Sequence, residues 1–345
     1  MSLIPATILT GFLGSGKTTL LKRVLAEAHG QKIAVIENEF GEENIDSDIL
    51  VSNTTEQIIQ MSNGCICCTI REDLRSTLQL LAEKKRQKLL DFDRVVIETT
   101  GLADPGPVTQ TFFIDDEVAE SYLLDSVITL VDAKHAQKQL DERQEARRQA
   151  GFADQIFISK SDLVAQDALG ALMHRLKHMN PRAPQKVVHF GEVSLTEVFD
   201  LRGFNLNAKL DIDPDFLKDD EHAHDTHEDH VHGAHCDHPA HVHHHHHDDV
   251  QSFVFRSDRP FDAAKLEDFL GAIVNIYGPR MLRYKGVLYM KGSDHKVIFQ
   301  GVHQLMGSDL GPKWTQGEHR CSKMVIIGID LPRDIFLQGM ERSLV

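Results

Sequence analysis

At 345 residues the chain is long for a single hydrophobic core, which predicts two folded domains. Its formal net charge of −15 is concentrated, because residues 211–249 hold 12 acidic residues and one lysine, or −11, which leaves about −4 for the rest. Two nearly neutral domains argue against a nucleic-acid partner. No run of 18 apolar residues occurs, which argues against a membrane span.

The cysteine content and the start of the chain predict a cytoplasmic protein. Three of the five cysteines fall within Cys65-Ile66-Cys67-Cys68, a poor disulfide framework but a good thiolate cluster in a reducing compartment. Residues 3–13 are apolar but lack a basic segment before them and run into a glycine-rich loop, so they predict a strand and not a signal peptide.

The first motif is Gly11-Phe12-Leu13-Gly14-Ser15-Gly16-Lys17-Thr18, which fits the G-x-x-x-x-G-K-[ST] phosphate-binding loop. Residues 4–10 are typical of a buried parallel strand, and residues 19–28 carry leucines at helical spacing. Backbone N–H groups should face the phosphates, Lys17 should reach the β and γ oxygens, and the Thr18 hydroxyl should ligate Mg²⁺. The predicted nucleotide-binding residues here are Gly11, Gly14, Ser15, Gly16, Lys17, Thr18 and Thr19.

Two polar segments follow. The first is an acidic loop, residues 38–46, that comes after a predicted strand at 32–37. GTPases keep a segment that senses the γ-phosphate at this position, and the alternative is a solvated connection.

The cysteine cluster precedes a capping box, Thr69 to Glu72, that opens a helix to about residue 88. The helix dipole favours thiolate there, and three thiolates can bind Zn²⁺ with one position open, which suits transfer. The alternative to a metal site is that these cysteines are small buried residues or an incidental thiol pair.

A predicted buried strand at 94–97 ends in Glu98-Thr99-Thr100-Gly101. In a phosphate-loop protein this spacing predicts the second Mg²⁺ element, in which Glu98 holds the ion and the Gly101 N–H meets the γ-phosphate. Lys17, Glu98 and Gly101 are therefore the candidate catalytic residues.

The guanine-reading element is Ser159-Lys160-Ser161-Asp162, after predicted strands at 123–131 and 155–158 and a polar helix at 135–150. The Asp162 carboxylate can accept from N1–H and the exocyclic amine of guanine, while the Lys160 stem covers the ring. Ser159 replaces the asparagine of the usual N-K-x-D and so removes an amide brace. A helix at 168–177 and a strand at 186–190 follow, and residues 189–192 are further candidates for base contact.

A histidine-rich tract separates the two domains. Thirteen of the 21 histidines fall between His222 and His247, interleaved with acids and Cys236. This composition predicts a disordered linker that binds divalent ions loosely, with an inert spacer as the alternative.

From residue 250 the globular pattern returns, with strands at 252–256, 281–290, 296–303 and 323–330 and helices at 262–276 and from 332. This order predicts a small α+β domain of ferredoxin-like kind, with a docking or regulatory role. Arg280, Arg283 and Lys285 are expected on a solvated sheet face.

These motifs, with N-E-F-G-E, G-C-I-C-C, E-T-T-G-L-A-D-P and S-K-S-D in that order, resemble the CobW-like family of metal-associated P-loop GTPases, and within it the YjiA branch and the zinc-regulated GTPase metalloprotein activators. The resemblance implies a GTPase-coupled metallochaperone that holds zinc at Cys65, Cys67 and Cys68, with Glu37 and Glu42 as further candidate ligands, and delivers it to a client metalloprotein. It also implies a mostly parallel α/β P-loop domain at 1–208, a linker at 209–250 and a CobW-type C-terminal domain at 251–345.

Alternatives stay open at this point. The histidine tract could make the protein a metal-storage protein, the cargo could be Co²⁺ or Fe²⁺ rather than Zn²⁺, and a cobalt chaperone for cobalamin synthesis is a further alternative. A small-molecule kinase fits poorly, because no acceptor base is visible. The client is not specified, and a homodimer is one open possibility.

Overall fold

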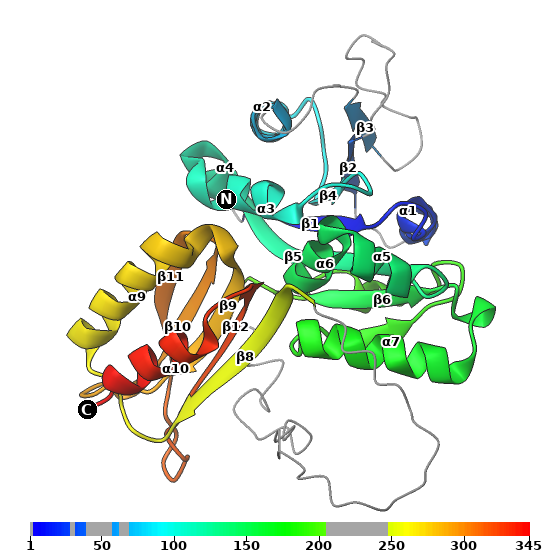
Figure 1. Ribbon diagram of the computed structural model, residues 1–345. Helices are drawn as coiled ribbons and strands as arrows, with labels where there is room; N and C mark the ends of the chain where they lie inside the picture. The colour runs from blue at the N-terminus through cyan, green and yellow to red at the C-terminus, as the bar shows by residue number, and fades with distance from the viewer. Residues whose placement is uncertain (1–2, 28–31, 39–56, 62–68, 205–247) are drawn as a thin grey trace, which may run out of the picture.

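The computed structural model describes residues 3–27, 32–38, 57–61, 69–204 and 248–345. In these residues the chain forms two domains that lie side by side, each built on one sheet (Figure 1). None of the described helices is long and apolar enough to cross a membrane.

The first domain is an α/β unit whose sheet has the order β3-β2-β4-β1-β5-β6-β7 among the described residues, with all neighbouring strands parallel. Its strands are β1 (Ile4–Gly11), β2 (Ile33–Asn38), β3 (Gln57–Met61), β4 (Arg94–Glu98), β5 (Tyr122–Asp132), β6 (Gln155–Ser159) and β7 (Gln185–Val187). Its helices are α1 (Lys17–Ala26), α2 (Thr69–Arg86), α3 (Pro105–Ile114), α4 (Asp116–Ser121), α5 (Ala136–Glu142), α6 (Gln144–Phe152) and α7 (Gln166–Met179), with 3₁₀ turns η1 (Ser161–Leu163) and η2 (Leu195–Glu197).

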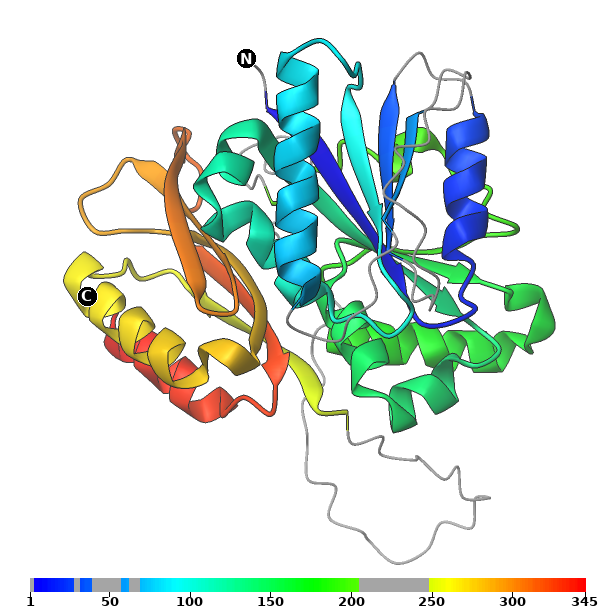
Figure 2. The same ribbon diagram turned by 90° about the horizontal axis from the view of Figure 1, so that it is seen from above.

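Helices cover both faces of this sheet, as a buried parallel sheet requires. Leu20, Leu21 and Val24 of α1 pack on one face, against Leu9, Val35 and Val96. Helices α2, α3, α6 and α7 pack on the other face. Seen from above, α1 and α2 stand on opposite sides of the strands (Figure 2).

The second domain is an antiparallel sheet of order β11-β10-β9-β12-β8 with two helices on one face. Its elements are β8 (Val250–Ser257), α9 (Ala263–Tyr277), η4 (Gly278–Arg280), β9 (Met281–Leu288), β10 (His295–Val302), β11 (Leu305–Lys313), β12 (Ser322–Ile329) and α10 (Arg333–Arg342). The predicted P-loop domain with a second α+β domain is confirmed. The order differs from a ferredoxin-like β-α-β-β-α-β unit, because β11 is added and the second helix follows the last strand.

Several element boundaries differ from the sequence-based expectation. The helix expected at 135–150 is two helices, α5 and α6, separated by the extended backbone of Arg143. The break is stabilised by Arg147, whose Nη1 donates to the carbonyl oxygens of Leu140 (2.6 Å) and Asp141 (3.2 Å) at the end of α5. The strand expected at 186–190 is shorter, and β3, α3, α4 and β11 were not predicted.

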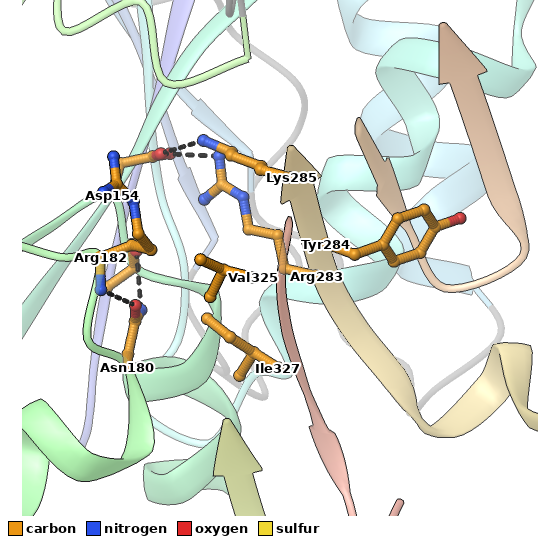
Figure 3. Close-up of a pocket in the computed structure, with 9 residues that line it drawn as sticks. Asp154, Asn180, Arg182, Arg283, Tyr284, Lys285, Val325 and Ile327 are labelled. Carbon is orange, nitrogen blue, oxygen red and sulfur yellow. Dashed lines mark hydrogen bonds and ion pairs between the residues drawn. The ribbon is translucent and has the colours of Figure 1, made fainter. Parts of the chain in front are cut away.

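The two domains share a buried seam of charged side chains, shown in Figure 3. Asp154, just before β6, forms ion pairs with Arg283 (2.6 Å) and Lys285 (3.0 Å) of β9, and all three side chains are at most 10% exposed. The expectation that these two cations lie on a solvated sheet face is wrong, because this face of β9 is covered by the first domain. Tyr284 points to the opposite side of β9 (Figure 3), into the core of the second domain.

Candidate functional site

The phosphate loop joins β1 to α1 in a conformation that requires glycine. Gly11 has φ 141°, and a Cβ there would lie 2.3 Å from the carbonyl oxygen of Leu130. Gly16 adopts the left-handed conformation (φ 100°) directly before α1. The loop therefore presents its backbone at the N-terminus of a helix, where N–H groups and the helix dipole favour phosphate.

Lys17 is buried within this loop. Its Nζ donates to the carbonyl oxygens of Gly11 (2.8 Å) and Phe12 (3.4 Å). Burial lowers the pKa of Lys17 from its usual value, and the charge of Glu98 acts in the opposite direction. The Lys17 ammonium group can exchange these neutral carbonyl acceptors for phosphate oxygens, because hydrogen bonds between two charged groups are stronger.

The Mg²⁺ element is assembled by two segments far apart in the sequence. Thr18 Oγ1 donates to Glu98 Oε1 at 2.8 Å, which brings the first turn of α1 to the end of β4. A hydroxyl oxygen and a carboxylate oxygen side by side are hard oxygen ligands, the set that Mg²⁺ prefers at nucleotide sites. These residues fit a bound Mg²⁺.

The loop after Glu98 lies on the phosphate loop. Thr99 is tied to β1 by its N–H to Leu9 (2.9 Å) and by its hydroxyl to that of Thr10 (2.9 Å). Gly101 lies so close to Leu13 that a Cβ would be 2.6 Å from the Leu13 nitrogen. The two loops are therefore in direct contact.

The S-K-S-D element is hydrogen-bonded to the phosphate loop at two points. Ser159 Oγ donates to the carbonyl oxygen of Ser15 (2.7 Å), and Lys160 Nζ donates to that of Gly14 (2.7 Å). Lys160 has φ 55°, an uncommon conformation for a lysine. The Ser159 hydroxyl thus contacts the loop directly, although it is shorter than an asparagine side chain.

Asp132 is a site residue that the sequence analysis missed. Its Oδ2 accepts from Lys160 Nζ (2.7 Å) and is 2.9 Å from His135 Nδ1. Burial alone would raise the pKa of Asp132, but the bonds from Lys160 and His135 keep it below its usual value. The available signal was its position at the end of β5, next to the strand that carries S-K-S-D.

The remaining base-binding candidates are exposed or lie against α1. Asp162 is exposed on η1. Gly191 packs on α1, since a Cβ there would be 3.0 Å from Leu20 Cα and 3.3 Å from the Thr19 carbonyl oxygen. Phe190 is 84% exposed beside it. An exposed aromatic ring is suited to stacking on a base.

The expected zinc ligands are only in part within the described residues. Glu37 is described, and it is the register partner of Glu98 on neighbouring parallel strands. Glu42, Cys65, Cys67 and Cys68 lie outside the described residues, as does the histidine tract from 205 to 247. Among the residues that the structure does describe, no group of three or more His, Cys, Asp or Glu side chains is placed to hold a metal ion.

The phosphate loop, the Thr18–Glu98 pair and the attached S-K-S-D strand end define a P-loop nucleotide-binding protein of the kind that reads guanine. Residues 5–186 match the CobW/HypB/UreG nucleotide-binding domain, and residues 250–344 match the cobalamin synthesis protein cobW C-terminal domain. The chain belongs to this CobW family.

Curated relatives match over almost the whole chain. The zinc chaperone YjiA of Escherichia coli is 38% identical over 335 residues, which cover 97% of this chain and 96% of the relative. The zinc chaperone CobW of Pseudomonas aeruginosa is 32% identical, with 99% and 92% covered. A crystal structure of Zn(II)-bound YjiA GTPase from E. coli matches with a TM-score of 0.75 at 34% identity, over 100% of both chains.

Proposed function

We propose that this GTPase uses its nucleotide state to control the binding and release of zinc for client metalloproteins. The Thr18–Glu98 contact carries the proposal, because it joins the phosphate loop to a strand whose neighbour carries a candidate zinc ligand, Glu37, one residue before its end. The similar proteins named as zinc chaperones and as a Zn(II)-bound GTPase support the same activity and cargo.

The sheet topology supports coupling between the nucleotide and the metal. Strands β3, β2, β4 and β1 are parallel neighbours, so their carboxyl ends, at Met61, Asn38, Glu98 and Gly11, share one edge. Neighbouring strands are about 4.8 Å apart. Cys65 follows Met61 by four residues, which span at most about 14 Å. The length of this segment therefore allows Cys65 to reach the Mg²⁺ element.

Hydrolysis in this site would rely on positioning and charge. Mg²⁺ held by Thr18 and Glu98 would neutralise charge on the β- and γ-phosphates. Lys17 would donate to the phosphate oxygens, and the Gly101 N–H would face the γ-phosphate. Loss of that phosphate removes the partner of the Gly101 loop, which changes the environment of Glu98 and of neighbouring Glu37.

The test is the zinc affinity of wild type and of the Cys65→Ser, Cys67→Ser, Cys68→Ser triple variant, each loaded with Mg²⁺-GDP or a non-hydrolysable GTP analogue. We expect zinc affinity in wild type to differ at least about tenfold between the two nucleotides, equivalent to about 1.4 kcal/mol, and the difference to vanish in the triple variant. Equal zinc affinities in wild type would contradict the proposal.

A deletion of residues 221–247 separates this proposal from metal storage in the histidine tract. The deletion should stop before Asp248 and Asp249, because Asp248 is bonded to Arg175 (2.6 Å) and Asp249 is paired with Arg147. If the cysteine site delivers zinc, the deletion variant should keep its nucleotide-dependent zinc affinity. If that dependence is lost, the histidine tract is the functional metal site instead.

A further inference from the structure

Helix α6 carries a buried amide that no motif of the sequence accounts for. Gln149 is 1% exposed, and its Nε2 donates to the carbonyl oxygens of Gly101 (3.2 Å) and Ala103 (2.9 Å). A side-chain amide has two N–H donors, so one side chain satisfies two carbonyl groups of the loop that follows Glu98. The loop is 46 to 48 residues away in the sequence.

The neighbouring residue holds the same loop at its far end. Arg148 Nη1 donates to Asp104 Oδ2 at 2.7 Å, and Asp104 caps the N-terminus of α3 by accepting from the Gly106 N–H (2.9 Å). Thr99 is tied to β1 at the near end, as described above. The loop is thus fixed at its start, in its middle and at its end, and two of these attachments come from consecutive residues of α6.

The Gln149 contact controls the orientation of the loop backbone. A trans peptide places its C=O and N–H on opposite sides, so a Gly101 carbonyl directed at α6 sets the peptide that follows Gly101. A change in this orientation would leave the buried amide with one of its two carbonyl partners, which is unfavourable. Gly101 also lies against Leu13 of the phosphate loop.

Helix α6 is itself held firmly on its other sides. Thr129 Oγ1 of β5 donates to the Gln149 carbonyl oxygen (2.8 Å). Gly151 packs against the second domain, where a Cβ would be 2.9 Å from Leu282 Cδ1, and the Phe152 carbonyl oxygen accepts from Arg283 (2.7 Å). The amide therefore projects from a support that both domains fix.

We infer that Gln149 is a positioning residue for GTP hydrolysis: its amide holds the Gly101 loop in the geometry that meets the γ-phosphate, and Arg148 assists it through Asp104. The inference rests on the proposed function, because the role of Gly101 belongs to that proposal. Preorganised donors and fixed loops act on the transition state more than on the binding of the ground state. The effect should therefore fall on kcat.

The experiment compares Gln149→Met, which keeps the side-chain length but removes both donors, with Asn180→Leu. Asn180 is a matched control, because it is also a fully buried amide whose Nδ2 donates to backbone carbonyl oxygens, those of Ala150 (2.9 Å) and Ala153 (2.9 Å) at the C-terminal end of α6. It has no contact with the Gly101 loop among its hydrogen bonds. The readouts are kcat and KM for GTP, the affinity for GDP, and the midpoint of thermal unfolding.

We expect kcat of Gln149→Met to fall about tenfold, or about 1.4 kcal/mol, with KM and GDP affinity within about twofold of wild type. Asn180→Leu should lower the unfolding midpoint at least as much but leave kcat within about twofold. The inference is overturned if folded Gln149→Met keeps wild-type kcat, or if Asn180→Leu loses as much.

Two further variants complete the test. Arg148→Met affects a partly exposed side chain and decides the question if Gln149→Met does not fold: a lowered kcat at unchanged GDP affinity supports the inference, and wild-type kcat contradicts it. Gly101→Ala separates the inference from the proposed function. If Gly101→Ala hydrolyses GTP normally, the proposed role of Gly101 fails; if only Gly101→Ala is impaired, the positioning role of Gln149 fails alone.

Discussion

The charged seam between the domains gives the sharpest prediction about stability. Asp154→Asn keeps the shape of the side chain but removes the carboxylate that forms ion pairs with both Arg283 and Lys285 (Figure 3). Asp154 also accepts from the Val127 N–H (3.0 Å), and Gly203 packs directly on its carboxylate. The substitution therefore leaves two buried cations facing a neutral amide.

The expected loss is about 3 kcal/mol in the free energy of unfolding. Removing one partner of a buried ion pair usually costs about 3–5 kcal/mol. The low end applies here, because Arg283 still donates to the carbonyl oxygens of Phe152 (2.7 Å) and Gly203 (3.0 Å), and Lys285 still donates to that of Gly203. These carbonyl groups compensate part of the lost charge interaction.

Urea unfolding measures this loss, followed by far-UV circular dichroism and by fluorescence of Trp314. Trp314 is the single tryptophan of the chain and is buried in the second domain, so its signal reports on that domain. Glu341→Gln is the control, because it removes an exposed pair with Arg259 and should cost less than about 1 kcal/mol. A loss for Asp154→Asn no larger than that of the control would refute the reasoning.

Three further predictions concern the nucleotide site and the second domain. Lys17→Met should weaken GTP and GDP binding about 100-fold by calorimetry, since charged hydrogen bonds contribute about 1.5–3 kcal/mol each; a smaller loss than tenfold would argue against its role. Ser159→Ala removes the neutral hydroxyl donor that contacts the carbonyl oxygens of Ser15 (2.7 Å) and Val131 (3.4 Å), and should weaken the binding of both nucleotides equally, about fivefold; an effect on only one of them would contradict this. Burial lowers the pKa of His303, which packs on Gly106, whereas the charge of Asp104 acts in the opposite direction. The unfolded chain therefore binds more protons than the folded protein between the lowered pKa and about 6.5, so stability should fall as pH drops through this window. His303→Phe should reduce that slope in thermal unfolding at pH 7.5 and 5.5, and an unchanged slope would contradict the assignment.

The sequence by itself predicted the elements whose chemistry is local. The phosphate loop needs glycines, a lysine and a threonine in consecutive positions between a strand and a helix, so its motif and its fold appear in one stretch. The same holds for S-K-S-D and for Glu98 to Gly101, which the structure places at strand ends around that loop. Because parallel strands end at one edge, their order in the chain was enough to expect them near one another.

The tertiary structure alone decided where charged and amide side chains are buried. Arg283 and Lys285 alternate along a strand in the way that a solvated face does. Their burial is made favourable by Asp154, 131 residues away from Lys285, and by carbonyl oxygens of the first domain. Gln149 likewise looks like a polar residue on a polar helix, until the fold brings the Gly101 loop to it. The physical reason is that the free energy of burying a polar group depends on its partner, and a partner distant in the sequence leaves no local pattern.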